Sequence, residues 1–229
     1  MGISGDTHII GPKQGTTILS YDGSGDSLTV PASVDWNFGT GDFCIEFWAN
    51  IQSGNGYLLS MGTHDGASSI AMSANTANGN TAFDIRNDSS TNTNMVASGI
   101  IFANQWHHYA VCRNGSKFYA YIDGVFKTSG DNDPSGNYGA STNVLYSGQI
   151  SSGGFSPAEY IDSIRVSKGV ARYPSGTTFT PPTEAFVSDS NTVFLLQSGT
   201  DGTQTPTTDT GNTGHTITYN GDVRWFAPK

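Results

Sequence analysis

The chain has 229 residues and a formal net charge of −9, and only 13% of its residues are charged. Its ten Lys and Arg residues are scattered singly, which argues against a nucleic-acid partner, because such proteins gather basic side chains on one face. No apolar run approaches the roughly 18 residues that a membrane-spanning helix needs. The N-terminal stretch MGISGDTHII has neither a basic nor an apolar region of the signal-peptide kind, so no signal peptide is expected.

Short runs rich in β-branched and aromatic residues follow one another along the chain, separated by Gly, Asn, Asp or Pro. No window shows an apolar repeat of 3.6 residues, so the sequence predicts an all-β protein. The expected strands lie at residues 17–23, 27–31, 42–51, 56–62, 69–73, 81–87, 94–102, 106–113, 117–122, 124–129, 143–148, 159–167, 191–197, 215–221 and 222–226.

The hairpin signals are sharpest in residues 106–130. Asn114-Gly115 and Asp123-Gly124 each lie between two alternating runs, and both dipeptides suit the positive φ angles of type I′ turns. They predict a three-stranded antiparallel meander. So many antiparallel strands must close as a barrel or pack as two sheets face to face.

Residues 160–166 pose a question, because strand alternation puts Asp162 in one row with Tyr160, Ile164 and Val166. The stretch that follows, SKGVARYPSGTTFTPPTEAF, contains three prolines and no alternation. It predicts a surface connection, with a helical turn at residues 169–173. Residues 1–15 are expected to form an extended tail, and residues 16–229 a single domain.

Cys44 and Cys112 both lie inside apolar strand patterns. We expect two buried free thiols. A disulfide is the alternative, and it would require the two strands to be neighbours.

Three stretches resemble one family in order along the chain: YDGSGDSLTVPASVDWNFGTGDFCIEFWANI, NQWHHYAVCRNGSKFYAYIDGVFKTSG and EYIDSIRVSKGVARYPSGTTFTPPTEAF. They are similar to the concanavalin-A-like modules of the laminin-G type, in particular to versions found in bacteriophage virion and tail proteins. The resemblance covers most of residues 16–186. It implies a jelly-roll sandwich of two antiparallel sheets, one of them concave.

The resemblance also suggests a structural Ca²⁺ ion. In related jelly rolls, an aspartate in a strand reading Asp-x-Val-Arg and oxygens of an early loop hold calcium. Asp162 occupies the first place here, and Asp22 and Asp26 lie in the early loop. The alternative is that Asp162 accepts backbone N–H bonds without any metal.

Residues 191–223 resemble the opening of such a module, although here they come last. One explanation is a circularly permuted sandwich, in which the final strands pair beside the first strands of the same chain. The other is that they dock on a neighbouring subunit and form a homo-oligomer. We favour the first explanation, because one chain then completes its own core.

Some enzymes of this fold cleave carbohydrates with two carboxylates that flank the scissile bond. The chain has only three glutamates, Glu46, Glu159 and Glu184, and no second acid follows Glu46 at the spacing of those enzymes. His107 and His108 are neighbours in a strand and therefore face opposite sides, which disfavours a shared metal ion. We expect no enzymatic activity.

The expected function is binding. The resemblance implies a phage virion surface protein, decorating the capsid or attached to the tail or fibres, with other virion proteins and a host-surface glycan as partners. Sugar recognition uses aromatic faces, and the candidate exposed residues are Trp36, Tyr57, Tyr138 and Tyr146. The alternative for each of them is packing against a sheet. The alternatives are a secreted or cell-surface bacterial adhesin of the lectin type and, less favoured, a glycoside hydrolase.

Overall fold

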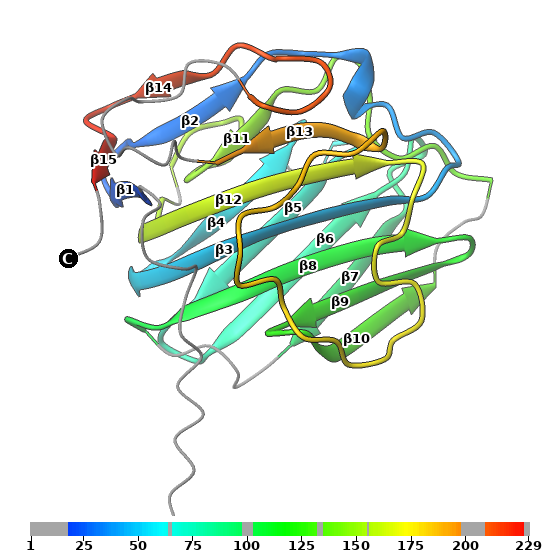
Figure 1. Cartoon of the computed structure of the whole chain (residues 1–229), viewed down its shortest axis with the longest axis horizontal. Helices are drawn as coiled ribbons and strands as arrows, with labels where there is room; N and C mark the ends of the chain where they lie inside the picture. The colour runs from blue at the N-terminus through cyan, green and yellow to red at the C-terminus, as the bar shows by residue number, and fades with distance from the viewer. Residues whose placement is uncertain are drawn as a thin grey trace, which may run out of the picture.

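The computed structural model describes residues 18–63, 66–97, 103–131, 135–154, 156–197 and 209–226. Two antiparallel sheets pack face to face (Figure 1), which confirms the expected two-sheet jelly-roll sandwich. The first sheet runs in the order β10 (Val125–Asp131), β9 (Lys117–Ile122), β8 (Trp106–Asn114), β3 (Phe43–Ser53), β12 (Ala158–Lys168), β1 (Ile18–Asp22), β15 (Arg224–Phe226), and β13 (Thr192–Leu196) also pairs with β12. The second sheet runs in the order β14 (Thr218–Asn220), β2 (Ser27–Val30), β11 (Leu145–Ser147), β4 (Asn55–Met61), β5 (Ile70–Asn75), β6 (Asn80–Arg86), β7 (Asn92–Ala97).

A single apolar core fills the space between the sheets. In β3, Ile45, Phe47 and Ala49 point into this core, whereas Glu46 and Trp48 alternate with them and face outward. Each large side chain buried in this way stabilises the fold by about 1.5–3 kcal/mol relative to leaving it exposed. Within the described residues, one 3-10 turn, η1 (Val34–Trp36), interrupts the β structure, and no helix has the length and apolarity needed to cross a membrane.

The predicted meander is present as β8, β9 and β10. Asp123 and Gly124 both have positive φ, as a type I′ turn requires, which confirms the second turn. The first turn lies one residue later than predicted, because Asn114 pairs with Lys117 and ends the strand. Gly115 therefore takes the first loop position, with a φ of +56°.

The C-terminal strands pair with the first strands of the same chain. β15 pairs with β1, β14 with β2, and β13 with the far half of β12. This is the arrangement that the sequence favoured over docking on a neighbouring subunit. The expected N-terminal tail, residues 1–15, lies outside the described residues.

The predicted row of Asp162 with Ile164 and Val166 is wrong. A bulge with a positive φ at Ser163 shifts the alternation within β12, so Ile161, Ile164 and Val166 face the core. Asp162 instead pairs with Trp48, which packs outside the first sheet, and its Oδ1 accepts a 2.9 Å hydrogen bond from the Ser163 hydroxyl. The carboxylate therefore does not interrupt an apolar row.

The expectation of free thiols is also wrong, because Cys44 and Cys112 form a disulfide. The two cysteines lie directly opposite each other on the neighbouring strands β3 and β8. Both are fully buried on the outer side of the first sheet. The sequence pattern left the strand pairing open, and this pairing decides whether the two cysteines are free or bonded.

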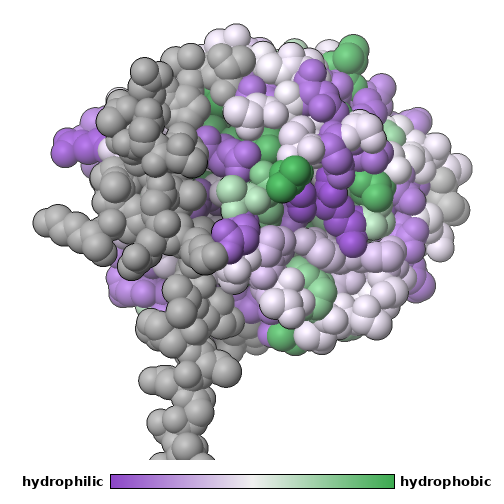
Figure 2. Space-filling model, viewed as in Figure 1, coloured by the Kyte–Doolittle hydropathy of each residue, from purple (hydrophilic) through white to green (hydrophobic). Residues whose placement is uncertain are grey.

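Residues 169–191, here called the strap, connect β12 to β13 and cross the outer face of the first sheet (Figure 1). The strap contains no helical turn at residues 169–173, contrary to expectation. Hydrogen bonds to the backbone of the strap fix it on the sheet. The Trp48 indole N–H donates to the Pro182 carbonyl, and the Phe179 amide donates to the Gly124 carbonyl. Where described residues are visible from this side, apolar residues form small patches among polar ones (Figure 2).

Candidate functional site

A cavity of about 280 Å³ lies beside β11, where β4 ends and β11 begins. Three separate stretches build its walls: the end of β4 with the connection to β5, the segment that enters β11, and the segment that leaves β11. The lining residues are Gly62, Thr63, Gly66, Ala67, Thr142, Asn143, Val144, Tyr146 and Ser151. They offer one aromatic ring, several hydroxyl groups and a side-chain amide.

Tyr146 reaches this cavity because of strand alternation. Its neighbours Leu145 and Ser147 point inward, where Leu145 joins the core and Ser147 accepts a 3.3 Å hydrogen bond from the Tyr21 hydroxyl. Tyr146 must therefore project from the outer face of the second sheet, and its side chain is half-buried. It is the one sequence-predicted aromatic that lines this cavity.

The amide of Asn143 is held in place before any ligand arrives. Its Nδ2 donates a 2.9 Å hydrogen bond to the Ser68 carbonyl. Gly62 passes close to the same amide: a Cβ at this position would lie 2.8 Å from Asn143 Oδ1, and Gly62 also has a positive φ of +79°. A side chain at residue 62 would therefore displace this wall of the cavity.

On the outer face of the second sheet, several of the described residues have short polar side chains. Thr29, Ser73, Asp84 and Asn94 each alternate with core residues and therefore point outward. This face contrasts with the outer face of the first sheet, which the strap covers.

The other predicted aromatic residues have different environments. Trp36 is fully buried, with its ring stacked 4.7 Å from His215, and Tyr138 is 1% exposed beneath the Arg113 guanidinium. Neither can offer a ring face to a ligand, so the prediction that they are exposed is wrong. Tyr57 is half-buried on β4 and does not line the cavity.

Asp22 and Asp26 lie together, as the calcium hypothesis requires, but their third partner is Asp222 instead of Asp162. Carboxylate oxygens of the three residues lie within 4.8 Å of one another. Asp26 is 1% exposed, and its two oxygens accept hydrogen bonds from the amides of Asp22 (2.9 Å) and Asp222 (2.8 Å). The three aspartates line a second cavity, of about 250 Å³. Arg224 also lines it and forms a 3.1 Å ion pair with Asp222.

These residues fit a calcium ion in chemical terms, because calcium prefers carboxylate and carbonyl oxygens. Sequence reasoning missed Asp222, which lies 196 residues from Asp26 along the chain. A usable signal existed: if the last strands pair beside the first, the Gly221-Asp222 turn must come near the early loop.

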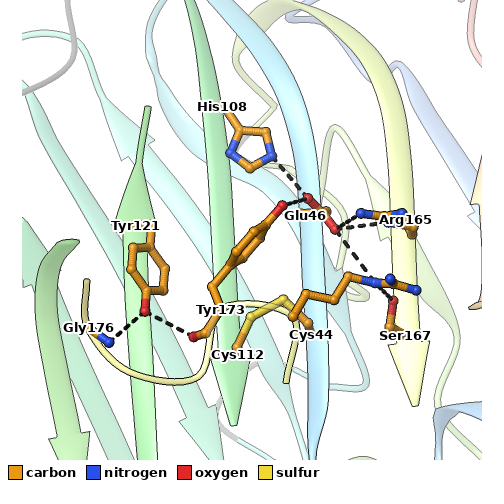
Figure 3. The surroundings of a disulfide bond; sticks show 10 residues. Cys44, Glu46, His108, Cys112, Tyr121, Arg165, Ser167, Tyr173 and Gly176 are labelled. Atoms are coloured by element: carbon orange, nitrogen blue, oxygen red, sulfur yellow. Dashed lines mark hydrogen bonds and ion pairs between the residues drawn. A yellow bond between two sulfur atoms is a disulfide. The ribbon is translucent and has the colours of Figure 1, made fainter. Parts of the chain in front are cut away.

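The two histidines predicted to face opposite sides have different partners. His107 Nδ1 lies 2.7 Å from Asp123, and His108 Nε2 lies 3.1 Å from Glu46. Glu46 is fully buried beneath the strap (Figure 3), where it accepts hydrogen bonds from Arg165 and Tyr173. Burial alone would raise the pKa of Glu46, but the hydrogen bonds and charges of these neighbours outweigh it and hold the pKa below the usual value.

Glu159 is buried without a counter-charge. Its carboxyl group lies inside the sandwich, and neither oxygen has a hydrogen-bond partner in the described structure. Burial raises the pKa of Glu159 well above the usual value, because the charged form loses its hydration and gains no partner. Glu46 and Glu159 are therefore both enclosed and cannot flank a sugar at the surface.

A Ser–His–Asp chain of hydrogen bonds lies at another place. His215 Nδ1 lies 2.9 Å from Asp209, and its Nε2 lies 3.1 Å from the Ser33 hydroxyl. However, the Asp35 carboxylate also lies 3.1 Å from Nε2, where it competes for the proton that a catalytic base must exchange with serine. The cluster instead joins the C-terminal segment to the loop before η1.

The two antiparallel sheets form a jelly roll of the concanavalin A-like kind. The model of the concanavalin A-like lectin/glucanases superfamily matches residues 22–171, more than half of the chain. The chain belongs to this superfamily. A comparison with curated protein sequences gives no match.

Solved structures share the fold at low sequence identity. A candidate carbohydrate-binding protein from Bacteroides ovatus matches with a TM-score of 0.65 and 17% identity, over 94% of this chain and 61% of the other. This chain thus spans less than two thirds of that protein's length. A heptameric SAP-like pentraxin from Limulus polyphemus matches with a TM-score of 0.57 and 13% identity, over 93% and 95% of the two chains. The botulinum neurotoxin serotype D binding domain matches with a TM-score of 0.52 and 12% identity, over 68% and 40%.

Proposed function

We propose that this chain is a non-catalytic glycan-binding module on the surface of a bacteriophage particle, where it decorates the capsid or belongs to the tail or fibres. The observation that carries the binding proposal is the projection of Tyr146 into a cavity lined by hydroxyl and amide groups. An aromatic ring packs against the apolar face of a sugar, while hydroxyl and amide groups exchange hydrogen bonds with its hydroxyls. The similar protein from Bacteroides ovatus is described as a candidate carbohydrate-binding protein, which agrees with this interpretation.

The buried positions of Glu46 and Glu159 support the non-catalytic part of the proposal. A glycoside hydrolase needs two carboxyl groups at the scissile bond. Incubation with the glycan that binds should release no new reducing ends. Release that is lost in a Glu46→Gln variant of unchanged fold would favour the hydrolase.

The Cys44–Cys112 disulfide supports a place outside the reducing cytosol. Virion surfaces and secreted adhesins both meet this condition, so the adhesin remains the second candidate. The phage assignment itself depends on the resemblance of three sequence stretches to phage virion and tail modules. Contacts with other virion proteins follow from it.

Immunogold labelling of purified particles from the source, with antibody to this chain, tests the location. Label over the head supports a decoration protein, and label over the tail or fibres supports a host-binding module. If particles carry no label while the surface of bacterial cells does, the adhesin replaces the phage protein.

We also propose that Asp22, Asp26 and Asp222 hold a structural Ca²⁺ ion. Its role would be to tie the turn between β14 and β15 to the loop after β1. Several oxygens of Asp26 and its neighbours are already engaged, so the affinity is expected to be modest, in the range of roughly 10⁻⁴ to 10⁻³ M that extracellular calcium modules show.

A further inference from the structure

The cavity beside β11 has features that go beyond a general preference for glycans. Three separate stretches of chain build its walls, and its volume of about 280 Å³ lies just below the usual range of about 300–1,000 Å³ for ligand pockets. Such a space accommodates one small unit and not a long stretch of polymer. A terminal sugar of a chain fits this shape better than an internal one, because an internal unit needs two open ends.

Among the described residues, the lining chemistry matches an uncharged sugar. The hydroxyls of Thr63, Thr142 and Ser151 and the amide of Asn143 both donate and accept hydrogen bonds, as sugar hydroxyls do. Tyr146 supplies the flat apolar contact. On a neutral pyranose, the sugar hydroxyls can pair with these polar groups, and the apolar ring face can pack on the tyrosine.

The negative charge of the molecule also favours an uncharged ligand. The formal net charge is −9, and the sequence pI is about 4.7. Asp84 and Arg86 both point outward from the same face of the second sheet and offset each other there, so the negative charge that acts on the cavity is that of the whole chain. An acidic surface lowers the local concentration of anions and slows their approach. A glycan with sialic acid, uronate or sulfate is therefore disfavoured.

The site is also formed in advance. The Asn143 amide is fixed by Ser68, and the Gly62 backbone lies directly against it. A preformed site loses little conformational entropy when the ligand binds. This matters most for a single sugar unit, whose few contacts cannot offset a large ordering cost.

We propose that the cavity beside β11 binds the neutral terminal sugar of a host-surface glycan, with Tyr146 as the stacking platform and Asn143 as the orienting amide. The inference rests on the proposed glycan-binding function and specifies its ligand class and its site.

The test is a titration of the whole chain with matched pairs of oligosaccharides. Each pair contains a neutral oligosaccharide and the same one capped by sialic acid, sulfate or uronate. We expect neutral members to bind at least about tenfold more tightly than their capped partners, a difference of about 1.4 kcal/mol. The preference should persist in 0.15 M salt, because capping also blocks the terminal unit.

Variants locate the site. Tyr146→Ala should weaken binding of the neutral members about tenfold, whereas Tyr146→Phe, which keeps the ring, should bind within about twofold of the native chain. Tyr57→Ala is the matched control, because Tyr57 is an aromatic of similar burial outside the cavity, and it should leave binding unchanged. Equal melting temperatures of all variants exclude a folding defect.

The outcomes separate the two proposals. Tighter binding of capped members, lost in Tyr146→Ala, would overturn the neutral-ligand inference and leave the glycan-binding function standing. Binding that survives Tyr146→Ala but is lost in Tyr57→Ala would overturn the site. No binding by any member of a broad panel would overturn this inference and the binding function together.

Discussion

The hydroxyl of Tyr173 donates a 2.8 Å hydrogen bond to Oε2 of Glu46, and this bond joins the strap to β3 (Figure 3). Arg165 on β12 donates two hydrogen bonds to the other carboxylate oxygen, at 2.6 and 2.9 Å. One buried carboxylate therefore connects two strands and the strap. The charge is satisfied within the protein, and the outer face of the first sheet is closed as a result.

The Glu46→Gln substitution should destabilise the fold. Removing one partner of a buried ion pair leaves the other charge uncompensated and costs about 3–5 kcal/mol. The loss is expected at the lower end of this range, because glutamine keeps some of the hydrogen bonds. Urea unfolding at pH 7 measures the effect, and Glu184→Gln on the exposed part of the strap is the control.

Glu46 also predicts a dependence on pH. Its pKa is lowered in the folded chain, so its stabilisation is present above the ordinary glutamate pKa of about 4.3 and is lost as the pH falls through the lower folded value. The native chain should lose stability in this acid range more steeply than Glu46→Gln. Parallel acid profiles of the two proteins would show that Glu46 is not the titrating group.

Glu159 should behave in the opposite way. Its folded pKa is raised, so the folded state is favoured below pH of about 4.3, and stability falls as the pH rises toward the folded value. Replacing it with methionine removes an unsatisfied polar group from the core. We expect Glu159→Met to stabilise the chain at pH 7 by about 1–3 kcal/mol, measured by urea unfolding. A destabilised variant would mean that the carboxyl group has a partner in solution.

The disulfide closes a loop across 68 residues of sequence separation. For a loop of this length, chain entropy predicts a contribution of about 4 kcal/mol to the free energy of unfolding. The double variant Cys44→Ala, Cys112→Ala should show this loss in urea unfolding at equal pH. Alkylation in denaturant without reductant, followed by mass spectrometry, checks the bond directly, and two modified cysteines would contradict it.

Calcium should raise the melting temperature if Asp22, Asp26 and Asp222 bind it. At 10 mM Ca²⁺ and a dissociation constant of about 1 mM, the gain is about 1.4 kcal/mol, or roughly 3–6 °C for a chain of this size. A chelator should reverse the shift, and Asp222→Asn should abolish it. Asp162→Asn is the matched control. A calcium response that is lost with Asp162 and kept without Asp222 would restore the assignment to Asp162.

The predictions from sequence that hold are mainly local. The Asp123-Gly124 turn was predictable because positive φ at two consecutive positions is a property of those residues themselves. The same is true of the strand periodicity and of the all-β class. His107 and His108 were assigned to opposite faces by alternation alone, and their separate partners agree with this.

The site depended on non-local information. Strand alternation says that two neighbouring residues face opposite sides, but it does not say which side is covered. Trp36 and Tyr138 were predicted to be surface aromatics, yet both are buried, because segments distant in sequence pack over them. The bulge at Ser163 moved Asp162 out of its expected row through a single positive φ, which no composition pattern marks.

The sequence by itself determined the all-β class, the meander and the absence of basic clusters, since these follow from side-chain periodicity, turn chemistry and composition. Only the tertiary structure decided that Cys44 meets Cys112, that Asp222 completes the acidic cluster, and that Tyr146 alone of the four aromatic candidates lines the cavity. The physical reason is the same in each case. Strand pairing brings residues together across 68 or 196 positions of chain, and the energy of that pairing belongs to the whole sheet and not to any short stretch.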